Sequence, residues 1–177
     1  SVLSIDSSTS VSCQNGAVEV ESTRYPFCFA GDPARPQSTS GIINYFPFND
    51  DLNRYLLVVK GLTGAKAKVT WGAQSKEFPV ADLEKGVNLA AAFAAHTPFD
   101  ETFQKVERAL WNQQEPDPLF TENFFHQQAG YRTMAPNAGA SIDQVIAAIM
   151  AQDKQRAADA AALVVPVHHT IKIETIP

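Results

Sequence analysis

The sequence predicts an α+β fold, because strand-like alternation fills the first half of the chain and helical periodicity fills most of the second. Residues 1–80 are expected to be β-rich and residues 81–165 mainly helical, and residues 168–176 alternate again as a final strand. We therefore expect one domain over residues 1–177. An antiparallel, sandwich-like sheet from the first half would be joined by the last strand and covered by three or four helices.

Residues 11–20 show the clearest hairpin pattern in the chain. Asn15-Gly16 tolerates the positive φ angles of a two-residue type I′ turn. That turn predicts the register Val11 with Val20, Ser12 with Glu19 and Cys13 with Val18. Residues 1–10 also resemble a strand, so we expect the chain to begin within a structural element, as a fragment of a longer protein would.

Further strands are predicted up to residue 80. The alternating aromatics of 25–29 predict a third strand, and the Pro- and Ser-rich residues 31–41 predict a loop. The apolar run 55–59 predicts a strand covered on both faces. Residues 66–71 predict a half-exposed strand with Ala67, Val69 and Trp71 inward, which turns at 72–75 into a strand over 76–80.

The helices are predicted from their ends and their apolar stripes. A short helix over 81–85 ends at Gly86, and Thr97-Pro98 begins a longer one with a stripe of Phe99, Phe103, Val106 and Leu110. Pro116 and Pro118 end that helix, and the next one runs to about Gln128, before a loop over 130–140. Ser141 to Gln144 form a capping-box pattern at the start of an Ala-rich helix, whose stripe is Ile142, Val145, Ile146, Ile149 and Met150.

Composition excludes several classes of partner. The net charge is -5 and basic residues are scattered, which argues against a nucleic-acid or anionic-membrane partner. No apolar run is long enough to span a membrane. No phosphate-binding glycine loop or dinucleotide fingerprint occurs, so we expect no cofactor. Cys13 and Cys28 are either one disulfide or two small buried side chains, and their spacing matches no metal or redox motif.

Catalytic motifs are missing from these residues. A serine hydrolase needs a nucleophile on a sharp turn and a histidine base, but no Gly-x-Ser-x-Gly elbow occurs. In Gly31-Asp32-Pro33, proline stands where a Gly-Asp-Ser block has its nucleophile. His168 and His169 are neighbours on a strand and so point to opposite faces, which does not suit one metal. We therefore assign no catalytic residue and no metal ligand.

Two groups of residues remain as binding candidates. Asn49-Asp50-Asp51 has oxygen ligands that suit Ca²⁺ but lacks the spacing of a known calcium loop. The alternative is a turn, in which Arg54 pairs with Asp50 or Asp51. Tyr45, Phe46, Phe48 and Trp71 form either an aromatic platform for a sugar ring or part of the core.

Three stretches resemble a known family. They are Glu21 to Phe29 (ESTRYPFCF), Phe46 to Tyr55 (FPFNDDLNRY), and Lys66 to Gly72 (KAKVTWG) continuing through Lys85 to Ala91 (KGVNLAA). Together with the Thr97-Pro98-Phe99 helix start, they resemble the region C-terminal to the catalytic domain in SGNH/GDSL-type hydrolases of planctomycete-like bacteria. The resemblance extends from about Ser1 to Trp111 and fades in the last helices.

The resemblance implies a non-catalytic accessory domain of an exported ester hydrolase. In that family the Gly-Asp-Ser and Asp-x-x-His blocks lie upstream, and neither has a match here. The family implies a secreted or periplasmic enzyme that acts on an acylated carbohydrate or lipid. This chain would pack beside its own upstream catalytic domain, with Asn49, Asp50, Asn53, Arg54 and Trp71 as binding candidates. The alternatives are a stand-alone β-rich carbohydrate-binding module, which predicts an exposed Trp71, and a structural or assembly domain.

Overall fold

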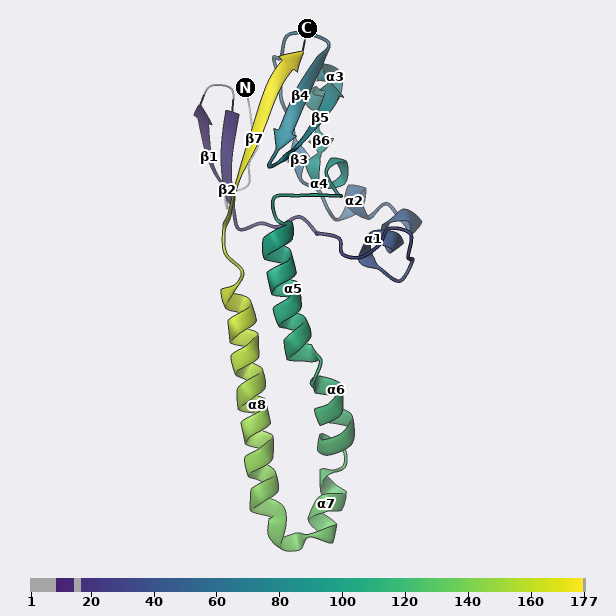
Figure 1. The fold of residues 1–177 in the computed structure, drawn as a ribbon, viewed down its shortest axis with the longest axis vertical. Helices are drawn as coiled ribbons and strands as arrows, with labels where there is room; N and C mark the ends of the chain where they lie inside the picture. The colour runs from purple at the N-terminus through teal and green to yellow at the C-terminus, as the bar shows by residue number, and fades with distance from the viewer. Residues whose placement is uncertain (1–8, 15–16, 177) are drawn as a thin grey trace. The chain divides into compact units, whose positions relative to one another are not determined.

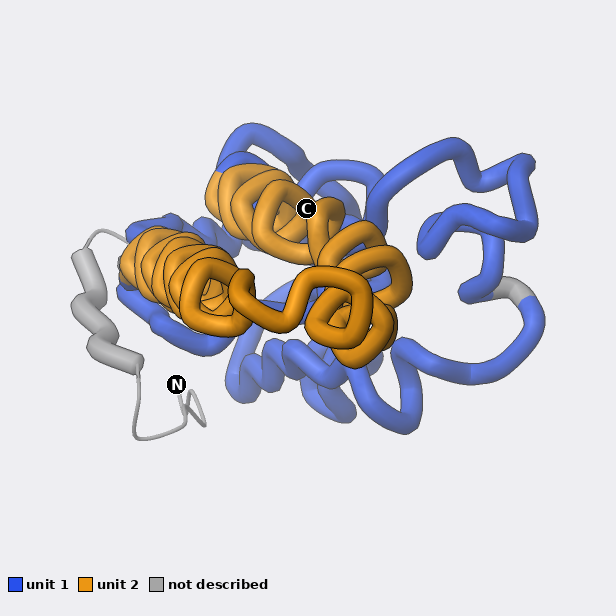
Figure 2. The backbone as a smooth tube through the Cα atoms, turned by 90° about the horizontal axis from the view of Figure 1, so that it is seen from below, with its two compact units in different colours: residues 1–101, 166–177 blue, residues 102–165 orange. Residues whose placement is uncertain are grey.

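The computed structural model describes residues 9–14 and 17–176 (Figure 1). The chain divides into two compact units, residues 1–101 with 166–177 and residues 102–165 (Figure 2). We call these the sheet unit and the helical unit and describe each by itself. No helix among the described residues has the length and apolarity to cross a membrane.

The sheet unit contains every strand among the described residues, together with several short helices. Its strands are β1 (Thr9–Gln14), β2 (Ala17–Ser22), β3 (Leu56–Leu57), β4 (Lys66–Trp71), β5 (Gln74–Pro79), β6 (Val87–Asn88) and β7 (Val167–Ile176). Its helices are α1 (Thr39–Ile42), η1 (Ile43–Tyr45), α2 (Phe48–Asp51), α3 (Val80–Lys85), α4 (Leu89–Ala92) and the start of α5 (Asp100–Gln114). The mixed α+β fold is therefore as predicted.

The main sheet has five antiparallel strands in the order β1-β2-β7-β4-β5. The predicted hairpin register is confirmed, since Val11 pairs with Val20 and Cys13 with Val18. The predicted turn at Asn15-Gly16 lies outside the described residues. The last strand, β7, returns to the centre of the sheet between β2 and β4, so the two ends of the chain's sequence meet in one sheet.

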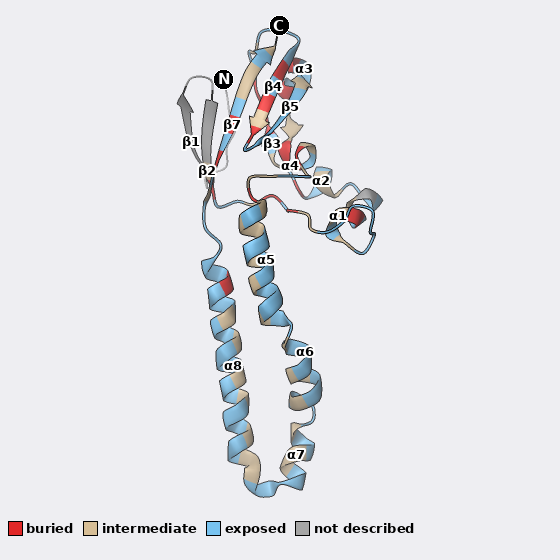
Figure 3. Cartoon of the chain, viewed as in Figure 1, coloured by how far each residue is buried: buried red, intermediate tan, exposed pale blue. Residues whose placement is uncertain are grey.

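Buried residues alternate with more exposed ones along β4 and β7, the strands of the sheet that carry its buried side chains (Figure 3). Ala67, Val69 and Trp71 of β4 are buried, as their alternation predicts. The opposite face holds charged pairs between exposed groups, such as Lys68 with Glu174 at 3.8 Å and Lys172 with Glu174 at 2.7 Å. That polar face is typical of a sheet surface in contact with water.

Two predicted strands differ from the structure. Residues 25–29 are extended but join no sheet, because the Asn53 side chain, rather than a neighbouring strand, binds the Phe27 backbone. The run 55–59 is not covered on both faces: β3 is only two residues long, pairs with β6, and leaves Leu56 exposed while Leu57 and Val59 are buried. Its pattern is therefore that of a one-sided strand.

The helix ends in the sheet unit follow their sequence signals. Gly86 ends α3 with φ +112°, a conformation that other residues rarely adopt. The Thr97 hydroxyl accepts a hydrogen bond from the Phe99 N–H and donates one to the Asp100 carboxylate. α5 begins at Asp100, slightly later than predicted, and Thr97 still caps its entry.

The helical unit consists of the rest of α5, α6 (Asp117–Phe120), the π-helical turn η2 (Thr121–Phe125), α7 (Gln128–Met134), η3 (Pro136–Ala138) and α8 (Gly139–Ala162). The predicted break at Pro116 and Pro118 is confirmed. The predicted loop over 130–140 is wrong, because α7 continues through Gly130 and α8 already begins at Gly139. Ser141 therefore lies inside α8 and caps nothing.

The helical unit has very little core of its own. Within residues 102–165, all of which the structure describes, Ala160 alone is fully buried. The predicted stripes are only half-buried: Phe103, Val106, Ile142 and Ile149 are intermediate, while Leu110, Val145 and Met150 are exposed. Of the stripe predicted to bury one face of this helix, Phe99 alone is buried, so the face is less covered than its spacing predicts.

Candidate functional site

The predicted polar segment 49–54 forms the end of α2 and the turn after it. Asn53 is buried, and its side-chain oxygen accepts from the Phe27 N–H at 2.7 Å while its amide donates to the Phe27 carbonyl and to the Asn49 side chain. This side chain thus ties segment 49–54 to the extended segment 25–29. Asn53 holds the loop in place and presents no free group to a ligand.

A second asparagine, Asn88, supports the same loop from β6. Its amide donates to the Asn49 carbonyl at 2.8 Å and to the Asn53 carbonyl at 2.9 Å, and its oxygen accepts from the Tyr55 N–H at 3.0 Å. We did not single out Asn88 from the sequence, although it lies in the Gly-Val-Asn-Leu stretch of the family resemblance. The sequence signal that could have identified Asn88 is a polar residue between apolar neighbours, just after the end of a predicted helix.

The outer side of the loop is charged and open to solvent. Asp50, Asp51 and Arg54 are exposed. Arg54 donates from Nε to the Asp50 backbone carbonyl at 2.5 Å, whereas we predicted a pair with a carboxylate. Arg24 Nη2 donates to the Arg54 carbonyl at 3.5 Å, so two arginines meet at this end of the loop. Of the predicted binding residues, Asp50 and Arg54 are therefore exposed, Asn49 is half-buried, and Asn53 is buried.

An aromatic cluster lies against this loop. Phe27 contacts Phe29 and Phe48 with ring centroids 5.1 Å apart in each pair, and Phe46 contacts Phe48 at 5.6 Å. Phe27 and Phe46 are exposed, and so is the neighbouring Tyr45, at 72%. We call Phe27, Phe29, Tyr45, Phe46 and Phe48 the aromatic patch. A group of exposed large apolar side chains next to a braced polar loop is typical of a contact surface.

Trp71 does not belong to that patch. It is completely buried and contacts Tyr55, Phe93 and Phe99 within the core. The core interpretation of this residue is therefore the one that the structure shows. An exposed Trp71, as a stand-alone sugar-binding module predicts, is ruled out because no face of the indole reaches solvent.

A hydrogen-bonded chain of buried groups runs through the core beside Trp71. The Trp71 indole N–H donates to His169 Nδ1 at 3.0 Å, and His169 Nε2 lies 3.1 Å from the Tyr55 hydroxyl. Because an indole is only a donor, Nδ1 is unprotonated and Nε2 carries the hydrogen of the neutral ring. The Tyr55 oxygen then accepts from Nε2, and the Ser22 hydroxyl is a further side-chain partner of Tyr55.

Burial determines the protonation of the groups in this hydrogen-bonded series. Burial, with a smaller effect of neighbouring His168, lowers the pKa of His169 to about 4. Burial raises the pKa of Tyr55, while its bond to Ser22 and the charge of Arg24 lower it by less. Both ring nitrogens of His169 are occupied, so this histidine is a structural group and is not placed to take a proton from a serine.

The other candidate chemical groups are scattered. His168 is exposed and pairs with Glu21 at 3.2 Å, on the face of β7 opposite to His169, as the strand pattern predicts. Cys28 is a free, buried thiol, and burial raises its pKa to about 11. Among the described residues, no three of the side chains that bind metals lie together. The arrangement supports contact and positioning through the loop and the aromatic patch.

The comparisons with known proteins give one structural neighbour. No protein-family model matches the chain, and no curated protein matches it in sequence. The fold is similar to that of BT4096, a gut microbial diltiazem-metabolizing enzyme, with a TM-score of 0.65 and 19% sequence identity. The match covers 96% of this chain and 46% of the neighbour's, so the chain spans a little under half the length of that protein. At this identity the similarity establishes a shared fold.

Proposed function

We propose that this chain is a non-catalytic domain of an SGNH/GDSL-type ester hydrolase, which supports the active-site domain and shapes the mouth of its cleft. The sequence stretches that resemble this family support the proposal, and two of them form the contact surface. Phe46 to Tyr55 supplies much of the aromatic patch and the loop, and Lys85 to Ala91 supplies the Asn88 side chain that braces it. The structural neighbour is an enzyme whose chain is about twice as long as the matched part.

The observation on which the proposal depends is the aromatic patch beside the polar loop. Exposed Tyr45, Phe46 and Phe27 leave apolar surface in contact with water, and covering it with another domain is favourable. Asp50 and Arg54 stand at the edge of that surface, where a substrate in a neighbouring cleft would meet them. The family resemblance implies that the whole enzyme is exported. It also implies that the substrate is an acylated carbohydrate or lipid.

The first experiment compares this chain with the longer gene product. The reading frame is expected to continue upstream into a Gly-Asp-Ser block. The longer product should hydrolyse p-nitrophenyl acetate, and the 177-residue chain should not. Ester turnover by the isolated chain, or the lack of any upstream catalytic block, would overturn the proposal.

A second experiment tests the role of the loop in the longer enzyme. Arg54→Ala and Asp50→Ala are expected to lower kcat/KM by about tenfold, which corresponds to the loss of one charge-assisted contact. Lys60→Ala is the matched control, since Lys60 is exposed and outside the loop. Unchanged kcat/KM in both loop variants would show that the loop does not contribute to the cleft.

The aromatic patch is tested by binding. The upstream domain, expressed separately, should bind this chain, and Tyr45→Ser with Phe46→Ser should weaken that binding. Trp111→Ser is the control, because Trp111 is also an exposed aromatic but lies in the helical unit. If the chain instead self-associates through the patch and ignores the upstream domain, an assembly domain is the correct function.

A further inference from the structure

The helical unit contains a pocket beside the break between α5 and α6. Pro116, which follows the end of α5, lines a cavity of ≈ 200 Å³ together with residues of α5, α6 and α8. None of the lining residues belongs to the loop or to the aromatic patch described above. The pocket is therefore a separate candidate for ligand binding.

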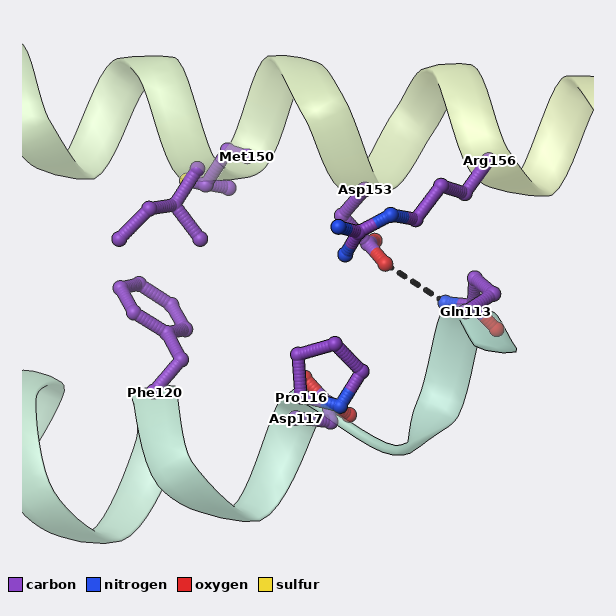
Figure 4. Close-up of a pocket in the computed structure, with 8 residues that line it drawn as sticks. Gln113, Pro116, Asp117, Phe120, Met150, Asp153 and Arg156 are labelled. Carbon is purple, nitrogen blue, oxygen red and sulfur yellow. Dashed lines mark hydrogen bonds between the residues drawn. The ribbon is translucent and has the colours of Figure 1, made fainter. Parts of the chain in front are cut away.

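The pocket has an apolar end and a polar end (Figure 4). Phe120 faces α8 near Met150, and Ile149 completes the apolar lining. At the polar end, the Gln113 amide donates to the Asp153 carboxylate at 2.7 Å. A ligand that fills both ends therefore needs an apolar body and a polar head.

The polar end carries a net negative charge. Its charged lining residues are Asp117, Asp153 and Arg156, so two carboxylates stand against one guanidinium and the balance is one negative charge. A ligand with one positive charge neutralises this balance, whereas an anion adds to it. Asp153 is half-buried and Asp117 is exposed, so the charge of Asp153 is the less screened of the two.

The hydrogen bonds at this end leave acceptors for a cationic head. One oxygen of Asp153 accepts from Gln113, and among the described residues neither its other oxygen nor the Asp117 carboxylate has a donor. An ammonium group has three N–H donors and no acceptor, so it suits such oxygens. Arg156 has no hydrogen bond or ion pair with any residue that the structure describes, so its long side chain can extend into water when a cation enters.

We propose that this pocket binds a primary ammonium compound with an apolar body, its head on Asp153 and Asp117 and its body against Phe120, Ile149 and Met150. A cavity of about 150 Å³ holds benzene, so a cavity of ≈ 200 Å³ suits a body of that size with a short arm. An aromatic body also contacts the Phe120 ring, and pairs of aromatic rings attract each other beyond the effect of their buried area. This site is independent of the proposed support of a hydrolase, and the 177-residue chain is enough to test it.

The two methionines of the chain provide the measurement. Met150 lines the pocket, whereas Met134 is exposed on α7 and outside it. In a ¹³C-methyl-methionine NMR titration, phenethylammonium should shift the Met150 signal to saturation and leave the Met134 signal in place. Two matched ligands separate the head from the body: phenylpropionate has the same ring and arm with the opposite charge, and ethylammonium has the charge without the ring. Each should bind at least about tenfold more weakly.

Charge changes of opposite sign provide the decisive comparison. Asp153→Asn keeps an acceptor for Gln113 but removes the charge, and should weaken phenethylammonium binding by about tenfold. Arg156→Gln removes the positive charge from the polar end and should tighten the binding. Asp159→Asn removes an exposed carboxylate from the same helix outside the pocket and should not change the affinity.

Circular dichroism of the three variants checks that α8 is intact. The proposal is overturned if the Met150 signal does not respond, if phenylpropionate binds as tightly as phenethylammonium, or if Asp153→Asn binds as the parent does. Weaker binding by a folded Arg156→Gln variant overturns it too, because the guanidinium would then hold the ligand instead of repelling it.

Discussion

The sheet unit and the helical unit treat their polar and aromatic groups differently. In the sheet unit, Trp71, His169 and Tyr55 form a hydrogen-bonded chain inside a packed aromatic core. In the helical unit, Gln113 and Asp153 bond at the side of a partly open pocket, and Trp111 lies exposed on α5. The comparison teaches that buried packing is concentrated in the sheet unit, whereas nearly all side chains of the helical unit remain at least partly open to water.

Hydrogen bonding in the core of the sheet unit explains why the two units should respond differently to substitutions. In the described part of the chain, every buried side-chain nitrogen or oxygen has a partner. Leaving such a group unpaired after a substitution costs far more inside the core than at a wet surface. The four predictions below use this difference, and each has a counterpart that should respond less.

The largest expected effect separates the two tryptophans. Trp71→Ala removes the central ring of the core and the donor to His169, so we expect a loss of about 3–5 kcal/mol in the free energy of unfolding. Trp111→Ala, at a position 67% exposed, should change it by less than about 0.5 kcal/mol. Urea denaturation followed by circular dichroism measures both, and equal losses would contradict the division between the units.

The second effect concerns pH. The pKa of His169 falls from 6.5 in the unfolded chain to about 4 in the fold, so the unfolded state binds the proton more readily. The stabilisation is complete above pH 6.5 and is lost as the pH falls toward 4, by about 3 kcal/mol in all. Urea midpoints between pH 7 and pH 4 measure it.

Two histidine variants isolate this pH effect. His169→Gln should lower stability at pH 7 and flatten the dependence on pH. His168→Gln should keep most of the dependence, because burial is the larger cause of the lowered pKa of His169 and His168 is exposed. If His169→Gln retains the full acid sensitivity, His169 is not its source.

The third effect concerns the asparagine that braces the loop. Asn53→Ala leaves the Phe27 N–H and carbonyl without their side-chain partner, and we expect a loss of about 2–3 kcal/mol. Asn112→Ala is the counterpart at an exposed position of α5 and should have little effect. Thermal unfolding of the two variants makes the comparison, and matching transition temperatures would show that the loop does not need this brace.

The smallest effect lies in the helical unit. Gln113→Ala removes the bond to Asp153, which is half-exposed, so the expected loss is about 1 kcal/mol or less. Hydrogen exchange should show it as faster exchange of α8 amides near Asp153, with the β4 and β7 amides unchanged. Faster exchange in β4 as well would mean that the two units unfold together.

Much of the sheet unit was predictable because its signals are local. The hairpin register of residues 11–20 follows from turn geometry, and the burial of Ala67, Val69 and Trp71 follows from the period of a strand. The opposite faces of His168 and His169 follow from the same period. The end of α3 at Gly86 and of α5 before Pro116 follow from backbone chemistry.

The rest depended on contacts between segments far apart in the sequence. Residues 25–29 look like a strand, but the Asn53 side chain satisfies their backbone, and the sequence does not show that this amide replaces a sheet partner. Likewise, the aromatic spacing of Tyr45 to Phe48 did not tell exposed rings from core rings. The predicted loop over 130–140 failed because α7 tolerates Gly130 at an exposed position.

The sequence by itself determined the α+β class, the faces of β4 and β7, and the helix ends at Gly86, Thr97 and Pro116, because turn, period and capping signals act within a few residues. Only the tertiary structure decided that β7 lies at the centre of the sheet, that His169 is enclosed by Trp71 and Tyr55, and that Asn53 and Asn88 build the loop. These arrangements join residues far apart in the sequence, such as Ala17 of β2 with Lys172 of β7, and only packing in three dimensions selects such partners.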